Sequence, residues 1–262
     1  MFFLDTYQII KHQGKQYIPD ITKPVLPDTY AMGRPVISNT ITDDEAKAVA
    51  KLCPTSAISD TPISIDLGKC VFCKECERML GEKKIHFTND YKIATNNRNN
   101  LIINASDNAT IQIDDNVVRK EIRKIFGHSL RLRQISAGGD NSTEWELNAC
   151  SNVNFDMGRY GISFVASPRH ADGIVISGPV TANMEEALQI CFDAVPAPKI
   201  IILAGTDAIS GGIFAGSAAL RRDFINKYSI DLFVPGNPPH PLTFINGVLD
   251  LIKKKNKLLS GM

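Results

Sequence analysis

Residues 161–183, GISFVASPRHADGIVISGPVTAN, join two short apolar runs to a glycine-proline turn and the start of a helix. The runs 162–166 and 173–177 are rich in β-branched residues and almost continuously apolar, which is typical of strands buried on both faces of a parallel sheet. Asn183, followed three residues later by Glu186, predicts a capped helix after the turn. The stretch therefore predicts a strand, a turn and a helix around which the rest packs.

Further strand-turn-helix units follow towards the C-terminal end of the sequence. We expect strands beginning at residue 130 and at 199–205 and 231–236, and helices at 144–152 and 241–255. Repeats of this kind predict an α/β fold with a doubly wound parallel sheet and a site at the carboxyl ends of its strands. The loops at 137–146, 205–216 and 236–241 are expected to gather there.

Composition narrows the class of protein. The chain has 262 residues, of which 44% are hydrophobic and 22% charged, as expected for a globular protein. Its 29 basic and 28 acidic residues give no electrostatic footprint for nucleic acid. No run approaches the roughly 18 apolar residues that would span a bilayer, and Asp5 interrupts the apolar start of the chain. We therefore expect a cytoplasmic protein.

Cysteine spacing is the most specific chemical signal. Six cysteines are present, and four of them, Cys53, Cys70, Cys73 and Cys76, lie within 24 residues. Cys70 begins a C-x2-C-x2-C run and Cys53 precedes a proline, which is the ligand pattern of one [4Fe-4S] cluster in bacterial ferredoxins. Zinc is the alternative, although its cysteines usually come as two separate C-x2-C pairs. The sequence predicts one [4Fe-4S] cluster on these four thiolates.

A second cluster site is missing beside the first. It would need cysteines ten, seven and four residues before Cys53, where the chain has Asp43, Ala46 and Val49, and a further Cys-Pro after Cys76. Instead, the segment from residue 44 to 51 predicts a short helix capped by Thr42 or Asp43.

Residues 31 to about 105 carry GRPVIS, CPTSAIS, IDLGKCVFCKEC and IHFTNDYKIATNNRNNLIIN. This segment resembles the ferredoxin subunit of formate hydrogenlyase-type membrane-bound NiFe hydrogenases, itself similar to the 23-kDa-type subunit of complex I, a family that normally carries two clusters. The resemblance implies a small α+β ferredoxin-like domain at 41–105. We expect the proline-containing residues 1–40 to form an extended arm, and the polar residues 106–125 to form a linker that leads into a helix.

Residues 130 to 255, including RYGISFVASPRHADGIVISGPVTANMEEAL, resemble the small subunit of the same hydrogenases, the 20-kDa-type subunit of complex I. The resemblance implies a flavodoxin-like small-subunit domain at 126–262, so the chain looks like a fusion of two neighbouring subunits. In the family these loops hold a proximal [4Fe-4S] cluster through four cysteines. The corresponding positions are Asp140, Thr143, Asp207 and Asn237, so all four ligands are absent.

The replaced positions have two interpretations. Two carboxylates could hold Mg²⁺ or Ca²⁺, and otherwise the side chains form a hydrogen-bonded polar pocket. Glu146 matches a family carboxylate beside the cluster. The alternative is that it is an ordinary acidic residue of a helix. Cys150 and Cys191 do not match ligand positions and are expected to be small buried apolar residues.

The resemblance implies an electron-transfer or docking subunit, itself without catalytic residues, of a NiFe-hydrogenase-like or complex-I-like complex. Its partners would be a large-subunit homologue, similar to the 49-kDa subunit of complex I, and membrane subunits beyond it, at the inner face of the membrane. The alternative is a non-redox scaffold or regulatory subunit that keeps only the docking surface. A flavodoxin-like flavin binder is a third hypothesis, although no loop specifically marks a flavin site.

Overall fold

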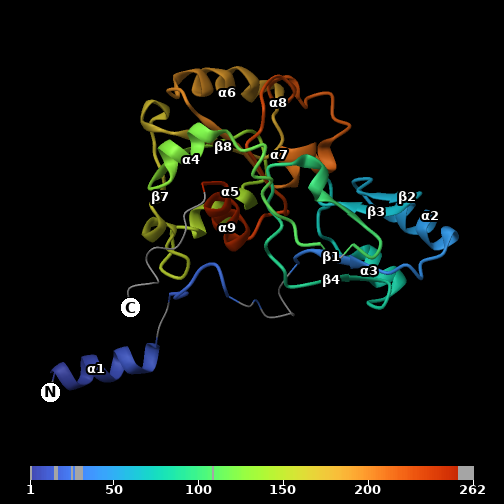
Figure 1. The fold of residues 1–262 in the computed structure, drawn as a ribbon, viewed down its shortest axis with the longest axis horizontal. Helices are drawn as coiled ribbons and strands as arrows, with labels where there is room; N and C mark the ends of the chain where they lie inside the picture. Colours follow the sequence, from blue (N-terminus) through green and yellow to red (C-terminus); the bar gives the residue numbers. More distant parts are fainter. Residues whose placement is uncertain (1, 15–16, 25, 27–31, 108, 253–262) are drawn as a thin grey trace.

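The computed structural model describes residues 2–14, 17–24, 26, 32–107 and 109–252. Its larger part contains a five-stranded sheet of order β10-β9-β8-β6-β7, in which every neighbouring pair is parallel. Figure 1 shows this part at the left and centre of the view and a smaller module at the right. The strands are β6 Leu130–Ser136, β7 Ile162–Phe164, β8 Gly173–Ser177, β9 Ile200–Ala204 and β10 Leu232–Val234. The helices are α4 Lys120–Phe126, α5 Ser142–Ala149, α6 Ala182–Ala194, α7 Thr206–Ser210, α8 Asp223–Lys227 and α9 Pro241–Ile252.

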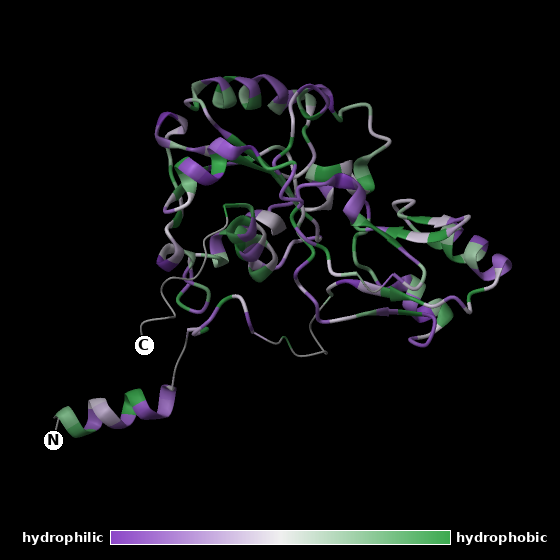
Figure 2. Cartoon of the chain, viewed as in Figure 1, coloured by the Kyte–Doolittle hydropathy of each residue, from purple (hydrophilic) through white to green (hydrophobic). Residues whose placement is uncertain are grey.

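Helices cover both faces of this sheet because its central strands are apolar on both sides. In β8, Ile174 and Ile176 point into one apolar cluster and Val175 into the other, as the twofold alternation of strand side chains requires. The first cluster receives residues of α6, α7 and α8, and the second receives residues of α4, α5 and α9. Figure 2 shows the hydrophobic central strands. The doubly wound α/β fold is confirmed.

The stretch 161–183 forms its two strands and its helix with two differences. β8 is buried along its whole length, but β7 is at the edge of the sheet and only Ile162 in it is fully buried. The N-cap position is Thr181, whose side chain makes no capping hydrogen bond, and our prediction of a cap at Asn183 was wrong. The Thr181 N–H donates to the Ala137 carbonyl, which fixes Thr181 in an extended conformation and starts the helix two residues earlier.

A smaller α+β module precedes the sheet. Its strands are β1 Pro35–Ile37, β2 Ile58–Asp60, β3 Ile63–Asp66, β4 Ile85–Phe87 and β5 Ile102–Asn104, in the antiparallel pairs β1-β4, β2-β3 and β3-β5. Its helices are α2 Asp43–Leu52, α3 Glu75–Leu80 and the 3-10 turn η1 Arg98–Leu101. The predicted helix after Thr42 is confirmed: Thr42 and Glu45 form a capping box.

We expected residues 1–40 to form an extended arm, but this segment is not extended throughout. Residues Phe2–Gln13 form helix α1, which ends at Gly14 with a positive φ of 63° (Figure 1). Neither glycine nor proline occurs between residues 2 and 13, so nothing interrupts the helix before Gly14. The prolines that suggested an extended chain begin only at Pro19.

The two modules pack directly against each other. One apolar cluster contains residues of α2, β3, β4 and β5 as well as residues of α6, α7 and β9. A backbone bridge joins Thr95 to Phe233 in β10. A Cβ on Gly68 would lie 2.9 Å from the Ile209 side chain of α7, so only glycine allows this approach. The expected domain limits, 41–105 and 126–262, stay predictions. Helix α4 begins at Lys120, inside the segment 106–125 that we had expected to be a linker.

Candidate functional site

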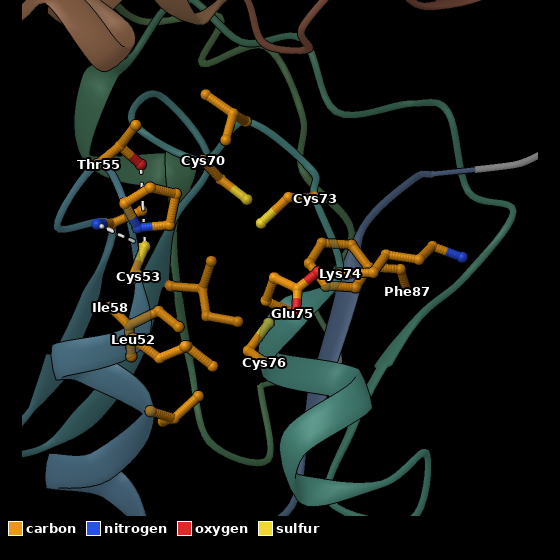
Figure 3. Close-up of a pocket in the computed structure, with 15 residues that line it drawn as sticks. Leu52, Cys53, Thr55, Ile58, Cys70, Cys73, Lys74, Glu75, Cys76 and Phe87 are labelled. Carbon is orange, nitrogen blue, oxygen red and sulfur yellow. Dashed lines mark hydrogen bonds between the residues drawn. The ribbon is translucent and has the colours of Figure 1, made fainter.

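Four cysteine side chains from two parts of the small module surround one space (Figure 3). They are Cys53, Cys70, Cys73 and Cys76, the four that the sequence singled out. The remaining lining is mostly apolar and includes Val49, Leu52, Pro54, Ala57, Ile58, Ile65, Val71 and Phe87. The fold therefore brings together thiols that are up to 23 positions apart in the chain.

Cys53 reaches this space from the C-terminal end of α2. It leaves the helix with extended backbone angles, φ −67° and ψ 118°, and Pro54 stops the helix from continuing. The chain then turns back through Ser56, which has a positive φ of 50°. This return brings the Ala57 N–H to the Cys53 sulfur, at an N to Sγ distance of 3.3 Å.

The other three thiols project from the loop before α3 and from its first turn. Phe72 and Lys74 both have left-handed backbone angles, with φ of 54° and 60°, which cost free energy for residues other than glycine. This curl brings the Phe72 N–H to the Cys70 sulfur, with an N to Sγ distance of 3.4 Å. Backbone N–H groups aimed at cysteine sulfurs are a feature of sites that hold anionic sulfur.

An ion pair anchors the start of the cysteine loop. Arg98 donates two hydrogen bonds to Asp66, with nitrogen to oxygen distances of 2.8 and 2.6 Å. Asp66 also accepts the Gly68 N–H through its side chain and the Cys70 N–H through its carbonyl. Planar two-point pairing of this kind fixes orientation as well as position.

Burial differs among the four thiols. Cys70 and Cys76 are buried, Cys53 is half-buried, and Cys73 is exposed. Burial, with a smaller contribution from the neighbouring thiols, raises the pKa of Cys70 well above its ordinary value and that of Cys76 to about 11. Without a bound cation these two groups stay protonated, and metal binding would have to release the protons.

The loops at the carboxyl ends of the strands gather as predicted. Thr143 in α5 lies beside Gly205: a Cβ on that glycine would be 2.9 Å from the Thr143 hydroxyl oxygen. The Thr206 N–H donates to the carbonyl of Gly236, the residue before Asn237. Among residues 2–14, 17–24, 26, 32–107 and 109–252, no group of three or more His, Cys, Asp or Glu is arranged to hold a single metal ion.

Two carboxylates in these loops have contrasting environments. Asp140 accepts the hydroxyl and the N–H of Ser142, at 2.6 and 3.0 Å, and these hydrogen bonds lower its pKa. Burial, with repulsion from Asp140, raises the pKa of Asp207 to about 6. One carboxylate oxygen of Asp207 is buried without a hydrogen-bond partner in the described structure.

Thr206 connects the two regions, and sequence patterns did not identify it. Its side chain is fully buried, and its hydroxyl lies 2.7 Å from the Cys70 carbonyl oxygen and 3.2 Å from that of Gly236. Only the packing of α7 against the cysteine loop reveals this role.

The two cysteines outside the four-thiol site differ in burial. Cys150 is fully buried, as expected, whereas Cys191 is half-buried.

Large apolar side chains are exposed next to the same loops. Trp145 in α5 is 70% exposed and Ile213, in the turn after α7, is 62% exposed, with Phe214 beside it at 41%. Contiguous exposed apolar patches are typical of protein interfaces, whereas single exposed apolar side chains occur on any surface. No helix within the described residues is long and apolar enough to cross a membrane.

The parallel sheet, its covered faces and its three gathered loops define a doubly wound α/β domain joined to a small four-cysteine module. Residues 141–251 match the sequence model of the family described as NADH ubiquinone oxidoreductase, 20 Kd subunit. The chain is 31% identical over 141 residues to a probable membrane-bound hydrogenase subunit, mbhJ, of Pyrococcus furiosus, a match that covers 54% of this chain and 84% of that subunit. The chain belongs to this 20-kDa subunit family.

Further similarities are to chains of other protein complexes. The F(420)H(2) dehydrogenase of Methanosarcina mazei contains a subunit that is 40% identical over 109 residues, which are 42% of this chain and 59% of that relative. A chain in the structure of the membrane-bound sulfane sulfur reductase, an archaeal respiratory membrane complex, is similar at 24% identity and a TM-score of 0.44, covering 52% of this chain and 77% of that one. The relatives are thus subunits of hydrogenase-like and complex-I-like assemblies.

Proposed function

We propose that this chain is an electron-transfer or docking subunit of a NiFe-hydrogenase-like or complex-I-like oxidoreductase, with one [4Fe-4S] cluster on Cys53, Cys70, Cys73 and Cys76. The observation that supports the cluster is the convergence of all four thiols on one space with a mostly apolar lining. When bound, such a cluster would carry single electrons. The residues around it would supply four thiolates and keep water away from two of them, Cys70 and Cys76.

The cysteine pattern and its hydrogen bonds support an iron-sulfur cluster rather than zinc. Zinc sites usually take their cysteines as two separate C-x2-C pairs, whereas here Cys70, Cys73 and Cys76 form one tight triplet. The N–H groups of Ala57 and Phe72, each directed at a sulfur, match the hydrogen bonds that tune the potential of clusters.

The same proposal assigns the two modules to two subunit types. Residues 41–105 would correspond to the ferredoxin-type subunit, and 126–262 to the small subunit, of formate hydrogenlyase-type membrane-bound hydrogenases. The proximal cluster of that small subunit would be missing, because Asp140, Thr143, Asp207 and Asn237 offer oxygen atoms that suit iron-sulfur clusters poorly.

We infer that the partner is a large-subunit homologue, similar to the 49-kDa subunit of complex I, which would dock on the face bearing Trp145, Ile213 and Phe214. Aromatic residues are enriched in interface cores, and Trp145 and Phe214 are exposed in the segments that carry Thr143 and Asp207. Attachment to the membrane would then be peripheral, on its inner face and through the partner's membrane subunits.

A non-redox scaffold is the second candidate. The loss of all four proximal ligands favours it, because electron transfer weakens steeply with distance and no cluster would bridge to the partner's site. In that case the four-cysteine cluster would be structural. A redox titration distinguishes an electron-transfer subunit from a scaffold. The cluster of a scaffold would show no reversible reduction at the potentials at which its complex works.

Anaerobic analysis of iron and acid-labile sulfide tests the central proposal. One cluster requires about four of each per chain. About eight would show that the loops from residue 140 to 237 bind a second cluster. Stoichiometric zinc without sulfide would overturn the proposal.

A further inference from the structure

A second cavity, of about 230 Å³, lies between the two modules and outside the four-thiol site. It is lined by Met32, Phe72, Ile93, Glu146, Pro235, Gly236, Asn237, Pro238, His240 and Thr243. The small module supplies Phe72 and Ile93, and the α/β domain supplies the polar groups. Liquid water takes about 30 Å³ per molecule, so the cavity has room for a ligand of roughly eight to ten non-hydrogen atoms.

Three polar side chains in this cavity have capacity to bind a ligand. The Glu146 carboxylate and the Asn237 amide make no hydrogen bond or ion pair with any described residue. His240 uses one ring nitrogen, because its Nδ1 lies 3.1 Å from the Leu242 backbone nitrogen. Pockets with apolar walls and a few converging polar groups are typical of small-molecule sites.

The hydrogen bond from Leu242 fixes which proton His240 carries. Since Nδ1 accepts from a backbone N–H, it is unprotonated, and the neutral ring carries its proton on Nε2. Burial lowers the pKa of His240, which keeps the ring neutral near pH 7. The ring is held in place by Phe155, whose centroid is 5.7 Å away in an edge arrangement. His240 therefore presents one N–H donor.

Glu146 presents the complementary acceptor. Burial raises its pKa, and the cavity lining contains no lysine or arginine that could pair with it. A ligand carboxylate or phosphate would be repelled by this group. A ligand must instead bring a donor to Glu146 and an acceptor to His240, beside an apolar body that fits against Phe72 and Ile93.

We propose that this cavity binds a small planar molecule whose primary carboxamide is attached to an aromatic or other apolar ring. The amide NH₂ would donate to Glu146, its carbonyl would accept from His240 Nε2, and the ring would lie between Phe72, Ile93 and the two prolines. Asn237 can pair with a ring substituent through either end of its amide. Neither the four thiols nor the partner face is required for this binding.

Benzamide is the probe, titrated into the whole chain and followed by saturation-transfer NMR. Saturable binding is expected, with benzoate at least about tenfold weaker because its charge opposes that of Glu146. Toluene, which lacks the polar group, should also bind at least about tenfold more weakly. Benzamide that fails to saturate, or benzoate that binds as well as benzamide, overturns the proposal.

Variants locate the site independently of this selectivity. Glu146→Leu should weaken benzamide binding about tenfold, the loss expected for one hydrogen bond to a charged group. Glu186→Leu, on the exposed face of α6, is the matched control and should leave binding unchanged. Equal binding by the Glu146 variant would place benzamide elsewhere and contradict the proposal. Iron content is measured on the same samples, so failure here stays distinct from failure of the cluster.

Discussion

The buried hydroxyl of Thr206 donates a hydrogen bond to the carbonyl oxygen of Cys70 at 2.7 Å, across 136 positions of the chain. Thr206 opens α7 at the carboxyl end of β9, and Cys70 begins the cysteine loop. The peptide that carries one candidate cluster ligand is therefore held directly by the loop that carries Asp207. The geometry of the small module depends on the α/β domain at this point.

Thr206→Val keeps the side-chain volume but removes this donor. The buried Cys70 carbonyl would lose its partner, so the variant should lose about 1–3 kcal/mol of unfolding free energy. Denaturant unfolding measures the change. Thr110→Val is the control, since Thr110 is exposed and its hydroxyl accepts a hydrogen bond from the nearby Gln112 side chain; an equal loss in both variants would contradict the role of the interdomain bond.

Cys73→Ser should abolish or cripple cluster assembly, because serine replaces one of four thiolates with a hydroxyl that binds iron poorly. Iron and sulfide per chain are the measured quantities. Cys191→Ser is the matched control: Cys191 is half-buried on α6, far along the chain from the four-cysteine space, and its loss should leave the iron content unchanged. If Cys73→Ser retains full iron content, Cys73 is not a ligand.

Asp207 should make the protein less stable as pH rises. Its pKa is about 6 in the folded chain, above the ordinary 3.8, so the folded state binds the proton more tightly and stability falls between about pH 4 and 6. Asp207→Asn removes this loss. Because the side chain is half-exposed, we expect a gain of only about 1 kcal/mol at pH 8 and almost none at pH 4. Denaturant unfolding at both pH values measures the difference in stability between this variant and the unmodified chain. An equal difference at pH 4 and pH 8 would contradict the raised pKa of Asp207.

Cysteine at Asp140, Thr143, Asp207 and Asn237 together should recover a cluster in the gathered loops. All four changes are needed, because a retained Asp207 would add negative charge and make a poor fourth ligand. EPR of the reduced quadruple variant should show a second [4Fe-4S] signal, magnetically coupled to the first. Were that signal already present in the unmodified chain, the claim that the proximal cluster is lost would fail.

Trp145→Ser should weaken binding to the large-subunit homologue by more than about tenfold, since truncated aromatic anchors typically cost about 2 kcal/mol or more. Native co-purification and a titration of the separate partner measure the effect. Ile190→Ser on α6 removes a similarly exposed apolar side chain from another helix and should have no effect. Recovery of this chain alone from native extracts would count against a stable partner.

Local sequence signals predicted the local parts of the fold well. The capping box at Thr42 and Glu45 depends on residues three positions apart, and β8 has the same limits that its β-branched run suggested. The cysteine set could be assembled because Cys-Pro and C-x2-C-x2-C are specific patterns. These features could be predicted because they depend on residues close together in the sequence and not on contacts with distant parts of the chain.

What the sequence did not reveal depends on partners far along the chain. The cap at Thr181 follows from its hydrogen bond to Ala137, and the edge position of β7 follows from the order of strands. Likewise, Glu146 and His240 line one cavity only because α5 and the loop before α9 are adjacent. Helix α1 was not predicted because the prolines from Pro19 onward suggested an extended chain, although Phe2–Gln13 contains no proline.

The connection between β5 and α4 makes contact between the two modules an intramolecular event. A short tether gives its ends an effective concentration in about the millimolar range. Separate polypeptides would need a much larger surface to stay together at cellular concentrations. The covalent connection also supplies one cysteine module for every sheet domain, so the Thr206 to Cys70 contact can form in each copy without matched synthesis of two proteins.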